Sequence, residues 1–327
     1  MITIKEIARL ANVSSATVSK VINGKDRYIS EETRKRVLEI VEREGYIPNG
    51  IAKSLKMKRT KTIGIILPDV MNLFFSEVAK GAEDAAERKG YTVILCNSDN
   101  SKAKEGKYIN ILQEKMVDGI ILTASEAETS KYLERCNIPM VLVDRDLELE
   151  KPVGRIVVDN VEGTYKATNY LISKGCKSIG FVSSQEVNKL AKERLLGYKK
   201  ALRENGMEID PNKIFLKSFT VETGYEGVYH LFNQGHVDGI CCGNDLIAIG
   251  VIQGLKEKGI SVPEEVKIIG FDNICIGKYL DPPLTTVRQP IYKLGEEAVN
   301  VLISIIEKKD IEMVKVLDTE IVVRASA

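Results

Sequence analysis

Apolar runs rich in isoleucine and valine alternate with amphipathic segments along most of the chain. Such runs predict buried strands at 61–68, 91–99, 118–125, 139–146 and 155–160, with helices between them at 76–90 and 104–116. The order recurs downstream, with strands predicted at 177–184, 213–219, 237–245 and 266–273 and helices at 190–206 and 245–259. Near-continuous apolar strands separated by helices are typical of parallel sheets covered on both faces. The pattern therefore predicts two similar α/β units of about 130 residues each.

The segment 1–47 has a helical pattern instead. Thr3 and Glu6 have the spacing of a capping box, followed by one apolar face made of Ile4, Ile7, Ala8 and Ala11. After the turn "NV", Ser14 is placed to cap a second helix whose inward side is predicted to hold Ala16, Val18 and Val21. A third helix is predicted from near Ser30 to a stop at Gly45. Three short helices with a tight turn between the first two predict a helix-turn-helix unit.

The second of these helices is short and polar on its outer side. A helix that lies in the major groove of DNA needs short side chains that let its backbone approach, and a few longer ones that reach base edges. Ser15, Ala16 and Lys20 are the candidates for reading bases, and Ser14, Thr17 and Ser19 are candidates for phosphate contacts. The alternative interpretation of the same residues is an ordinary solvated helix face.

Charge favours the DNA interpretation. Residues 1–61 contain 14 Lys and Arg against 7 Asp and Glu, which gives this segment +7 while the whole chain carries only +1. A basic module joined to a mildly acidic body indicates a polyanionic partner at one end. The apolar runs are too short to cross a bilayer and the N-terminus is charged, so we expect a cytoplasmic protein with no membrane partner.

Other functional classes find little support in the sequence. The six cysteines have no CxxC spacing, so neither a disulfide framework nor a metal site is predicted. With two histidines and neither a GxxxxGK[ST] nor a GxSxG motif, we expect no enzyme and no cofactor. A periplasmic sugar receptor is the other alternative, but it would carry a signal peptide where residues 1–60 have a helix-turn-helix pattern.

The segments "TIKEIARLANVSSATVSKVING" and "GYIPNGIAKSL", together with the α/β body, resemble the lactose/galactose-repressor (LacI/GalR) family over essentially the whole chain. The resemblance implies a headpiece at 1–47 and, at 48–61, a hinge helix and linker in which the helix (48–56) folds on double-stranded operator DNA. Its leucine would wedge into the minor groove, and two copies are needed, so a homodimer is implied. Lys20 stands where arginine or histidine is common in that family. The implied DNA-contacting residues are Thr3, Ser14, Ser15, Ala16, Thr17, Ser19, Lys20, Asn23, Tyr46, Asn49, Ala52, Lys53 and Leu55.

For the body, the resemblance implies a periplasmic-binding-protein-like pair of doubly wound parallel-sheet lobes. The chain would cross between them near 160, 290 and 318. The N-terminal lobe would comprise 62–160 and 290–318, and the C-terminal lobe 161–289 and 319–327. A cleft would lie between the lobes, and ligand binding there would control DNA binding allosterically.

Polar residues follow several predicted strands, where ligands of open α/β sheets bind. These pairs are Asp144 and Arg145, Asp159 and Asn160, Asn244 and Asp245, and Asp272 and Asn273. Each is weak evidence alone, because Asp245 serves equally well as a helix cap and Asp159 as a turn residue.

Resemblance to the ribose-type sugar receptors extends to individual positions. The matching residues are Asn72, Phe74, Phe75, Asp144, Arg145, Asn160, Arg194, Phe219, Asn244, Asp272 and Gln289. Charged groups would bind sugar hydroxyls and the phenylalanine rings would cover C–H faces; ordinary core packing of these rings is the less favoured alternative. The set favours a small neutral monosaccharide, ribose first, with another pentose, a hexose or a purine as alternatives. The expected function is a repressor of sugar-utilisation genes, and a corepressor would use the same parts.

Overall fold

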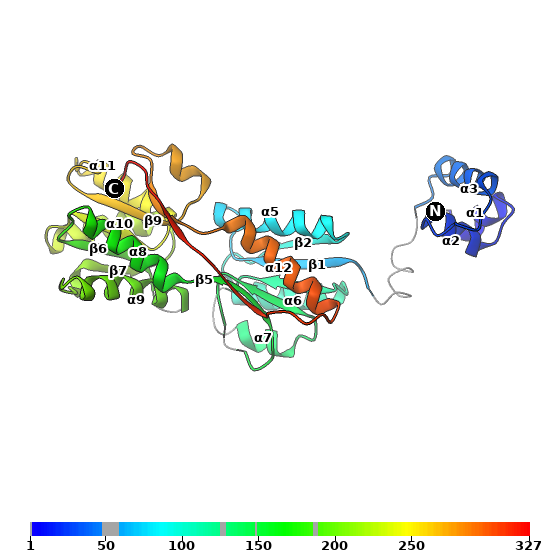
Figure 1. Cartoon of the computed structure of the whole chain (residues 1–327), viewed down its shortest axis with the longest axis horizontal. Helices are drawn as coiled ribbons and strands as arrows, with labels where there is room; N and C mark the ends of the chain where they lie inside the picture. The colour runs from blue at the N-terminus through cyan, green and yellow to red at the C-terminus, as the bar shows by residue number, and fades with distance from the viewer. Residues whose placement is uncertain (1, 48–58, 125–128, 148, 186–188) are drawn as a thin grey trace. The chain divides into compact units, whose positions relative to one another are not determined.

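A computed structural model describes residues 2–47, 59–124, 129–147, 149–185 and 189–327 (Figure 1). The chain divides into two compact units, residues 1–60 and 61–327. Most of the segment predicted to form the hinge helix and linker, 48–61, lies outside the described residues, and so do four of the predicted DNA-contacting positions, Asn49, Ala52, Lys53 and Leu55.

The first unit contains the predicted helix-turn-helix, built from α1 (Ile4–Leu10), α2 (Ser15–Ile22) and α3 (Glu31–Arg43). The capping box is confirmed, because the Glu6 amide donates to Thr3 Oγ1 and the Glu6 carboxylate accepts from the Thr3 amide. Ser14 caps α2 as predicted, Ser30 caps α3, which was predicted to start near it, and Gly45 follows α3 with φ 59°. Capping side chains therefore fix the N-terminal ends of all three helices.

Apolar residues from all three helices form the core of this unit: Ile7, Ala8, Ala11, Val18, Val21, Val37 and Ile40. The prediction that Ala16 faces this core is wrong, because Ala16 is exposed. Adjacent residues of a helix are about 100° apart, so a residue two positions from the buried Val18 points away from the core.

The body contains two six-stranded sheets, and the first has the order β11-β5-β4-β3-β1-β2, with every pairing parallel. Helices α5 and α12 cover one face of this sheet, and α6 and α7 pack on the other. The strands are β1 (Thr62–Leu67), β2 (Thr92–Asn97), β3 (Gly119–Leu122), β4 (Met140–Val143), β5 (Gly154–Val158) and β11 (Val314–Leu317). The helices are α5 (Leu73–Arg88), α6 (Lys102–Glu114), α7 (Ser130–Arg135) and α12 (Ile291–Ile306).

The second sheet has the order β12-β10-β9-β8-β6-β7 and is parallel except for the β10–β12 pair. Helices α8 and α9 pack on one face and α10 and α11 on the other. Its strands are β6 (Ile179–Ser184), β7 (Ile214–Lys217), β8 (Gly239–Cys242), β9 (Lys267–Asp272), β10 (Thr285–Arg288) and β12 (Glu320–Val322). Its helices are α8 (Asn160–Ser173), α9 (Lys189–Glu204), α10 (Val221–Gln234) and α11 (Asp245–Glu257), with short 3-10 turns η2 (Pro211–Lys213) and η3 (Cys275–Tyr279).

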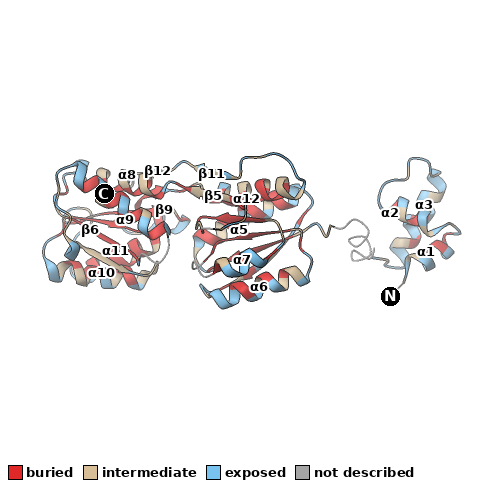
Figure 2. Cartoon of the chain, turned by 90° about the horizontal axis from the view of Figure 1, so that it is seen from below, coloured by how far each residue is buried: buried red, intermediate tan, exposed pale blue. Residues whose placement is uncertain are grey.

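The two sheets define two lobes, and the chain passes between them after β5, after β10 and after β11 (Figure 1). Figure 2 shows the strands largely buried and the helices exposed on their outer sides, as expected for sheets covered on both faces. The predicted fold class of two doubly wound parallel-sheet lobes is thus confirmed. Because the lobes face each other with their strand ends, polar residues after β4, β8 and β9 meet in one place.

Candidate functional site

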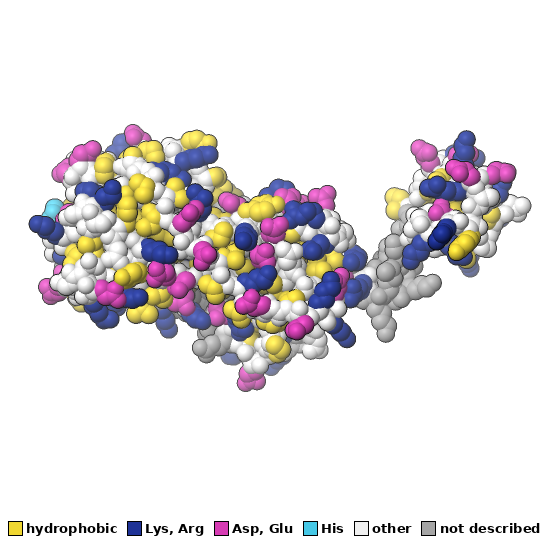
Figure 3. All heavy atoms as spheres, in the orientation of Figure 1, with side chains coloured by type: hydrophobic (Ala, Val, Ile, Leu, Met, Phe, Trp, Pro, Cys, Tyr) yellow, Lys and Arg dark blue, Asp and Glu magenta, His cyan; other side chains and the backbone are white. Residues whose placement is uncertain are grey.

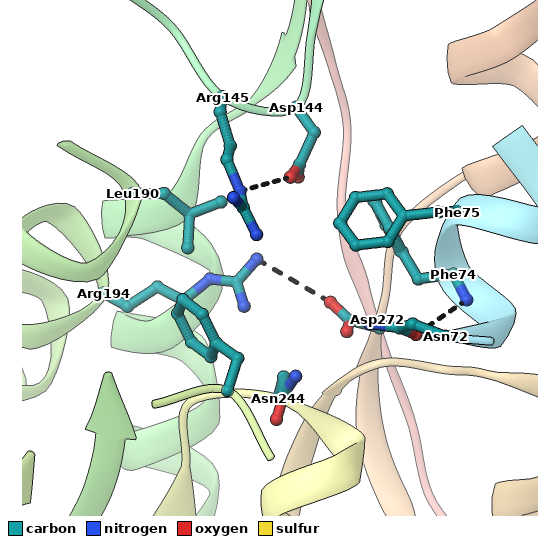
Figure 4. A pocket seen from close by; sticks show the side chains of 10 residues that line it. Asn72, Phe74, Phe75, Asp144, Arg145, Leu190, Arg194, Asn244 and Asp272 are labelled. Carbon is teal, nitrogen blue, oxygen red and sulfur yellow. Dashed lines mark hydrogen bonds and ion pairs between the residues drawn. The ribbon is translucent and has the colours of Figure 1, made fainter. Parts of the chain in front are cut away.

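A pocket of about 300 Å³, its open mouth included, lies between the two lobes (Figure 4). The first lobe contributes residues from the start of α5 and from the segment after β4, and the second lobe contributes residues from α9, from the segments after β7 and β8, and from the end of β9. The structure brings together nine of the residues selected from the sequence. The lining residues are Asn72, Phe74, Phe75, Asp144, Arg145, Leu190, Arg194, Phe219, Asn244 and Asp272.

On the first-lobe side, a capped helix end holds the aromatic wall. Asn72 Oδ1 accepts a hydrogen bond from the Phe74 amide at 3.0 Å, which fixes the first turn of α5. Phe74 and Phe75 contact each other edge to face, with ring centroids 5.1 Å apart. The guanidinium of Arg145 lies 5.6 Å from the Phe75 ring centroid, so this wall presents both an apolar face and a positive charge.

On the second-lobe side, Arg194 is the central group and is only 2% exposed. Its Nε donates to Asn160 Oδ1 at 3.0 Å, and its Nη1 donates to the carbonyl of Gly243. Its guanidinium lies 3.8 Å from the ring centroid of Phe271. These contacts from three sides hold the guanidinium in one orientation, with Nη2 toward Asp272 at 3.7 Å from Oδ1.

The two pocket aspartates, one from each lobe, both have left-handed backbone conformations. The φ angle is 65° at Asp144 and 121° at Asp272, a region that non-glycine residues rarely adopt. Such strain persists only where surrounding contacts impose it, and it is concentrated at functional sites. Here it places both carboxylates at the ends of β4 and β9, beside the pocket.

The charges of the pocket balance one another. Arg145 Nε lies 3.9 Å from Asp144 Oδ2, and Arg194 is paired with Asp272. Burial raises the pKa of Asp144 and Asp272 and lowers the pKa of both arginines, while the opposite charges in the cluster act against these shifts. The site therefore pairs two guanidinium groups with two carboxyl groups, and these side chains are almost entirely buried.

Two predicted residues, Asn160 and Gln289, lie behind the lining residues. Both are buried, and Asn160 accepts from Arg194 while Gln289 Nε2 donates to Asp272 Oδ1 at 2.7 Å. They therefore position the charged groups that line the pocket. Gln289 Oε1 is buried and has no hydrogen-bond partner among the residues that the structure describes.

Leu190 lines the pocket and was not predicted from the sequence. It precedes Arg194 by one turn of α9, so both side chains share one face of the helix. The four-residue spacing from Arg194 is therefore the feature of the sequence that could have identified Leu190 as a lining residue.

The remaining strand-end residues have structural roles. Asp159 is exposed and caps α8, because its Oδ1 accepts from the Glu162 amide at 2.8 Å. Asp245 is buried and accepts from Thr286 Oγ1 at 2.6 Å and from the Ile274 amide at 2.9 Å. Asn273 Oδ1 accepts from Arg324 at 2.7 Å. Of the four strand-end pairs, only the first contributes both members to the pocket lining.

In the headpiece, one stripe of α2 faces away from the core. Its members are Ala16, Ser19, Lys20 and Asn23, of which Ser19 is half-buried and the others are exposed. The spacing i, i+3, i+4, i+7 makes this a continuous helix face. Predicted base-reading residues Ala16 and Lys20 therefore lie together on a surface that short side chains leave accessible.

Other predicted DNA-contacting residues in the headpiece also stabilise it. Ser14 Oγ accepts from the Thr17 amide at 3.1 Å and lies 2.9 Å from Thr17 Oγ1. Asn23 Nδ2 donates to the carbonyl of Ser19 at 2.7 Å. Ser15 and Tyr46 are half-buried, and Tyr46 packs against the headpiece core.

The charge excess of residues 1–61 lies mostly outside the three helices of the headpiece. Residues 1–47 contain nine Lys and Arg against seven Asp and Glu, so five of the 14 basic residues fall in 48–61. On the face of the body shown in Figure 3, basic and acidic side chains are interspersed. The basic character is therefore concentrated in the segment that follows the helix-turn-helix.

Within the described part of the chain, no group of His, Cys, Asp and Glu could hold a metal ion, and the six cysteines are free. None of the described helices is long and apolar enough to span a bilayer.

Two family descriptions match the chain. Residues 3–49 match bacterial regulatory proteins of the lacI family, and residues 168–327 match a periplasmic binding protein-like domain.

Full-length relatives agree with both matches. The chain is 41% identical to the HTH-type transcriptional regulator RegA of Clostridium saccharobutylicum, covering 99% of this chain and 98% of that protein. It is 40% identical to the HTH-type transcriptional repressor PurR of Vibrio atlanticus, over 95% and 94% of the two chains. The crystal structure of a LacI family transcriptional regulator from Enterococcus faecium with bound ribose has a TM-score of 0.73 and 30% identity, and the match covers 81% of this chain and 98% of that one. The two relatives named above are transcriptional regulators and not enzymes, in agreement with the expectation that this chain is not an enzyme.

Proposed function

The chain belongs to the lacI family of bacterial regulatory proteins and is a DNA-binding transcriptional regulator, and from this premise we propose that it is a repressor controlled by a small neutral monosaccharide, ribose in the first place. The sugar binds in the pocket between the lobes. Sugar-utilisation genes are its proposed targets.

The observation that carries this proposal is the balanced charge of the pocket. Two arginines and two aspartates are already paired, so a ligand with a net charge would leave one of them unmatched in a buried site. A neutral polyol instead offers several hydroxyls, each of which both donates and accepts. Carboxylates accept from these hydroxyls and guanidinium groups donate to them, so every charged group gains a partner.

The apolar part of the pocket fits the flat side of a sugar ring. Phe74 and Phe75 form one wall, and Phe219 lies on the opposite lobe. Aromatic faces pack against C–H groups, which a monosaccharide presents on one side of its ring. The space of about 300 Å³, open mouth included, is at the lower end of the range for small-molecule pockets and favours a pentose over a larger ligand. The ribose-bound relative from Enterococcus faecium supports the same choice.

The mechanism proposed here is a population shift. Each lobe contributes one aspartate and one arginine, so a ligand that contacts all four binds best when the lobes are closed. The ligand can shift the equilibrium between lobe arrangements only by its difference in affinity for them. In the proposed homodimer, this change reaches the hinge and weakens binding to operator DNA.

For DNA recognition, we propose that the exposed stripe of α2 enters the major groove. Lys20 is its longest side chain and is exposed, so it can reach a base edge. Ser14, Thr17 and Ser19 are proposed to contact phosphates, and Thr3, Ser15, Asn23 and Tyr46 complete the surface. The proposed minor-groove wedge, Leu55, belongs to the segment outside the described residues.

The test is operator binding by fluorescence anisotropy at fixed salt, with genomic fragments selected by the full-length protein as the DNA. Ribose is expected to weaken binding, and the matched controls are arabinose, glucose, hypoxanthine and ribose 5-phosphate. If hypoxanthine acts and ribose does not, the ligand is a purine and the proposed sugar specificity is wrong. If ribose strengthens binding, the site assignment stands and ribose is a corepressor.

A further inference from the structure

An ion pair joins the two lobes at the rim of the pocket. Lys189 is the first residue of α9 in the second lobe, and Asp146 follows β4 in the first lobe. Lys189 Nζ lies 2.8 Å from Asp146 Oδ2, with 54% of the lysine side chain and 22% of the aspartate side chain exposed. The lysine directly precedes Leu190, which lines the pocket. The pair therefore lies beside the pocket and exists only while the lobes are close together.

Asp146 is held in place by its own lobe. Arg155 Nε donates to Asp146 Oδ1 at 2.6 Å, and Arg155 Nη2 donates to the carbonyl of Leu147 at 3.2 Å. Although burial acts in the opposite direction, hydrogen bonds from Lys189 and Arg155 hold the pKa of Asp146 below its usual value. The first lobe thus presents a fixed, charged acceptor whose second oxygen is available to the other lobe.

The positive charge of Lys189 gains little stabilisation from its own helix. It stands at the first position of α9, where the helix dipole disfavours a positive charge. Its ion pair with Glu193 in the same helix is long, at 4.0 Å, whereas the bond to Asp146 is short and raises the pKa of Lys189. The stabilising partner of this lysine is therefore on the opposite lobe.

The pair is connected to the pocket through α9. Glu193 accepts from Asn160 Nδ2 at 3.2 Å, and Asn160 accepts from Arg194. Because Lys189, Leu190 and Arg194 belong to one helix, any movement that brings Lys189 to Asp146 also brings the pocket residues of α9 toward the first lobe.

The lobes also touch through an apolar contact of a different kind. Ile274 is buried within the core cluster of the first lobe, and Leu246 and Ile249 pack against that cluster. Salt screens an exposed ion pair but does not weaken apolar burial. Ionic strength therefore separates the two contacts experimentally.

We propose that Asp146 and Lys189 form an electrostatic latch across the mouth of the pocket, which stabilises the closed arrangement of the lobes and so raises the affinity for the neutral ligand. They are positioning residues, because neither lines the pocket. The latch rests on the proposed function only for its effect on ligand affinity, since the contact itself requires no ligand. A consequence is that binding of an uncharged sugar depends on salt.

The first experiment measures ribose binding to the full-length protein, without DNA, by titration calorimetry at about 0.05 M and about 0.5 M salt. Affinity is expected to fall about two- to fivefold at the higher salt, the range for a partly exposed pair. Lys189→Met is expected to show the lower affinity at both salt concentrations and to lose the salt dependence. Lys192→Met, an exposed lysine on the same helix, is the matched control and should behave as the wild type.

A double-mutant cycle with Asp146→Asn isolates the pair. If the two residues act through each other, the ribose affinity of the double variant equals that of Lys189→Met. Any further loss is then limited to the effect of removing the Asp146–Arg155 bond. Additive losses, or a salt dependence that persists in Lys189→Met, would overturn the latch.

A second measurement needs no ligand. Leu190→Cys is introduced together with Cys275→Ser, because the other five cysteines are buried, and the rate of thiol labelling then reports opening of the pocket. Adding Asp146→Asn from the opposite lobe should speed labelling about two- to fivefold, and salt should speed it only while Asp146 is present. Equal rates refute the latch whether or not ribose binds. If labelling is faster but ribose does not bind to the wild-type protein, the latch is supported and the proposed ligand is wrong.

Discussion

Arg194 Nη2 lies 3.7 Å from Asp272 Oδ1, beyond hydrogen-bonding distance, while Gln289 Nε2 donates to that same oxygen at 2.7 Å. The charged pair at the centre of the pocket is thus held close without a direct hydrogen bond. Both contacts engage Oδ1, so a ligand hydroxyl that accepts from the guanidinium can donate to the same carboxylate. This geometry suits a ligand that bridges the two groups, and it guides the first prediction.

Replacing Arg194 with methionine should abolish detectable ribose binding. The change also removes the partner of a buried carboxylate, so the free energy of unfolding should fall by about 3–5 kcal/mol. Binding to DNA without ligand should persist, because the first unit is intact. Calorimetry and urea unfolding measure the two effects, and Arg203→Met, an exposed position on the same helix, is the control. Ribose affinity equal to that of the control would refute the assigned role.

Replacing Phe219 with leucine tests the aromatic wall. Leucine keeps apolar contact but lacks a flat face, so ribose affinity should fall about three- to tenfold. Phe215→Leu is the matched control, since Phe215 packs against the same core cluster but does not line the pocket. If both variants lose affinity equally, the ring of Phe219 acts through core packing and not through the ligand.

Replacing Lys20 with alanine tests the proposed DNA-reading face. If Lys20 reads a base edge, operator affinity falls and discrimination at one base pair weakens by about 1–3 kcal/mol. Competition anisotropy with single-base operator variants measures this. Lys35→Ala, exposed on α3, serves for comparison. A uniform loss over all operator variants, with a smaller salt slope, would instead assign Lys20 to a phosphate.

Ser14 combines a structural and a proposed DNA-binding role, and two substitutions separate them. Ser14→Ala removes the cap on α2 and should lower headpiece stability by about 1 kcal/mol. Ser14→Asp restores a capping oxygen, so stability should recover, while its negative charge should weaken operator binding. Thermal unfolding measures the stability of the two variants, and anisotropy measures their affinity for the operator. Wild-type operator affinity in Ser14→Asp would place DNA phosphates away from this residue.

Burial raises the pKa of Asp245 to about 7. Because the folded state then binds a proton more tightly than the unfolded state, this residue contributes stability at low pH that is lost as pH rises toward 7. The free energy of unfolding should fall by up to about 1.4 kcal/mol per pH unit in that window. Asp245→Asn should flatten this part of the profile, leaving the contribution of Asp272, whose pKa burial also raises. Urea unfolding at pH 5 to 7 measures the slope of the free energy of unfolding against pH. The same slope in the wild type and in Asp245→Asn would contradict the raised pKa of Asp245.

Local chemistry made much of this protein predictable from its sequence. Helix caps at Thr3, Ser14 and Ser30 depend on neighbours three residues away, so their spacing alone identifies the helix starts. Buried parallel strands are apolar along their whole length, and those quoted from the sequence are present. Most pocket residues were identified through the resemblance to known receptors, and several of them, such as Asp144, Asn244 and Asp272, lie at or just after the ends of strands.

Tertiary structure decided which of these polar residues share the pocket. Asp159 and Asn160 are adjacent, yet Asp159 caps a helix at the surface while Asn160 supports Arg194. The pair of Asp146 and Lys189 is separated by 43 residues and links two lobes, so no local pattern announces it. Such contacts depend on how the two sheets face each other, and that arrangement results from the packing of the whole chain and not from any single segment.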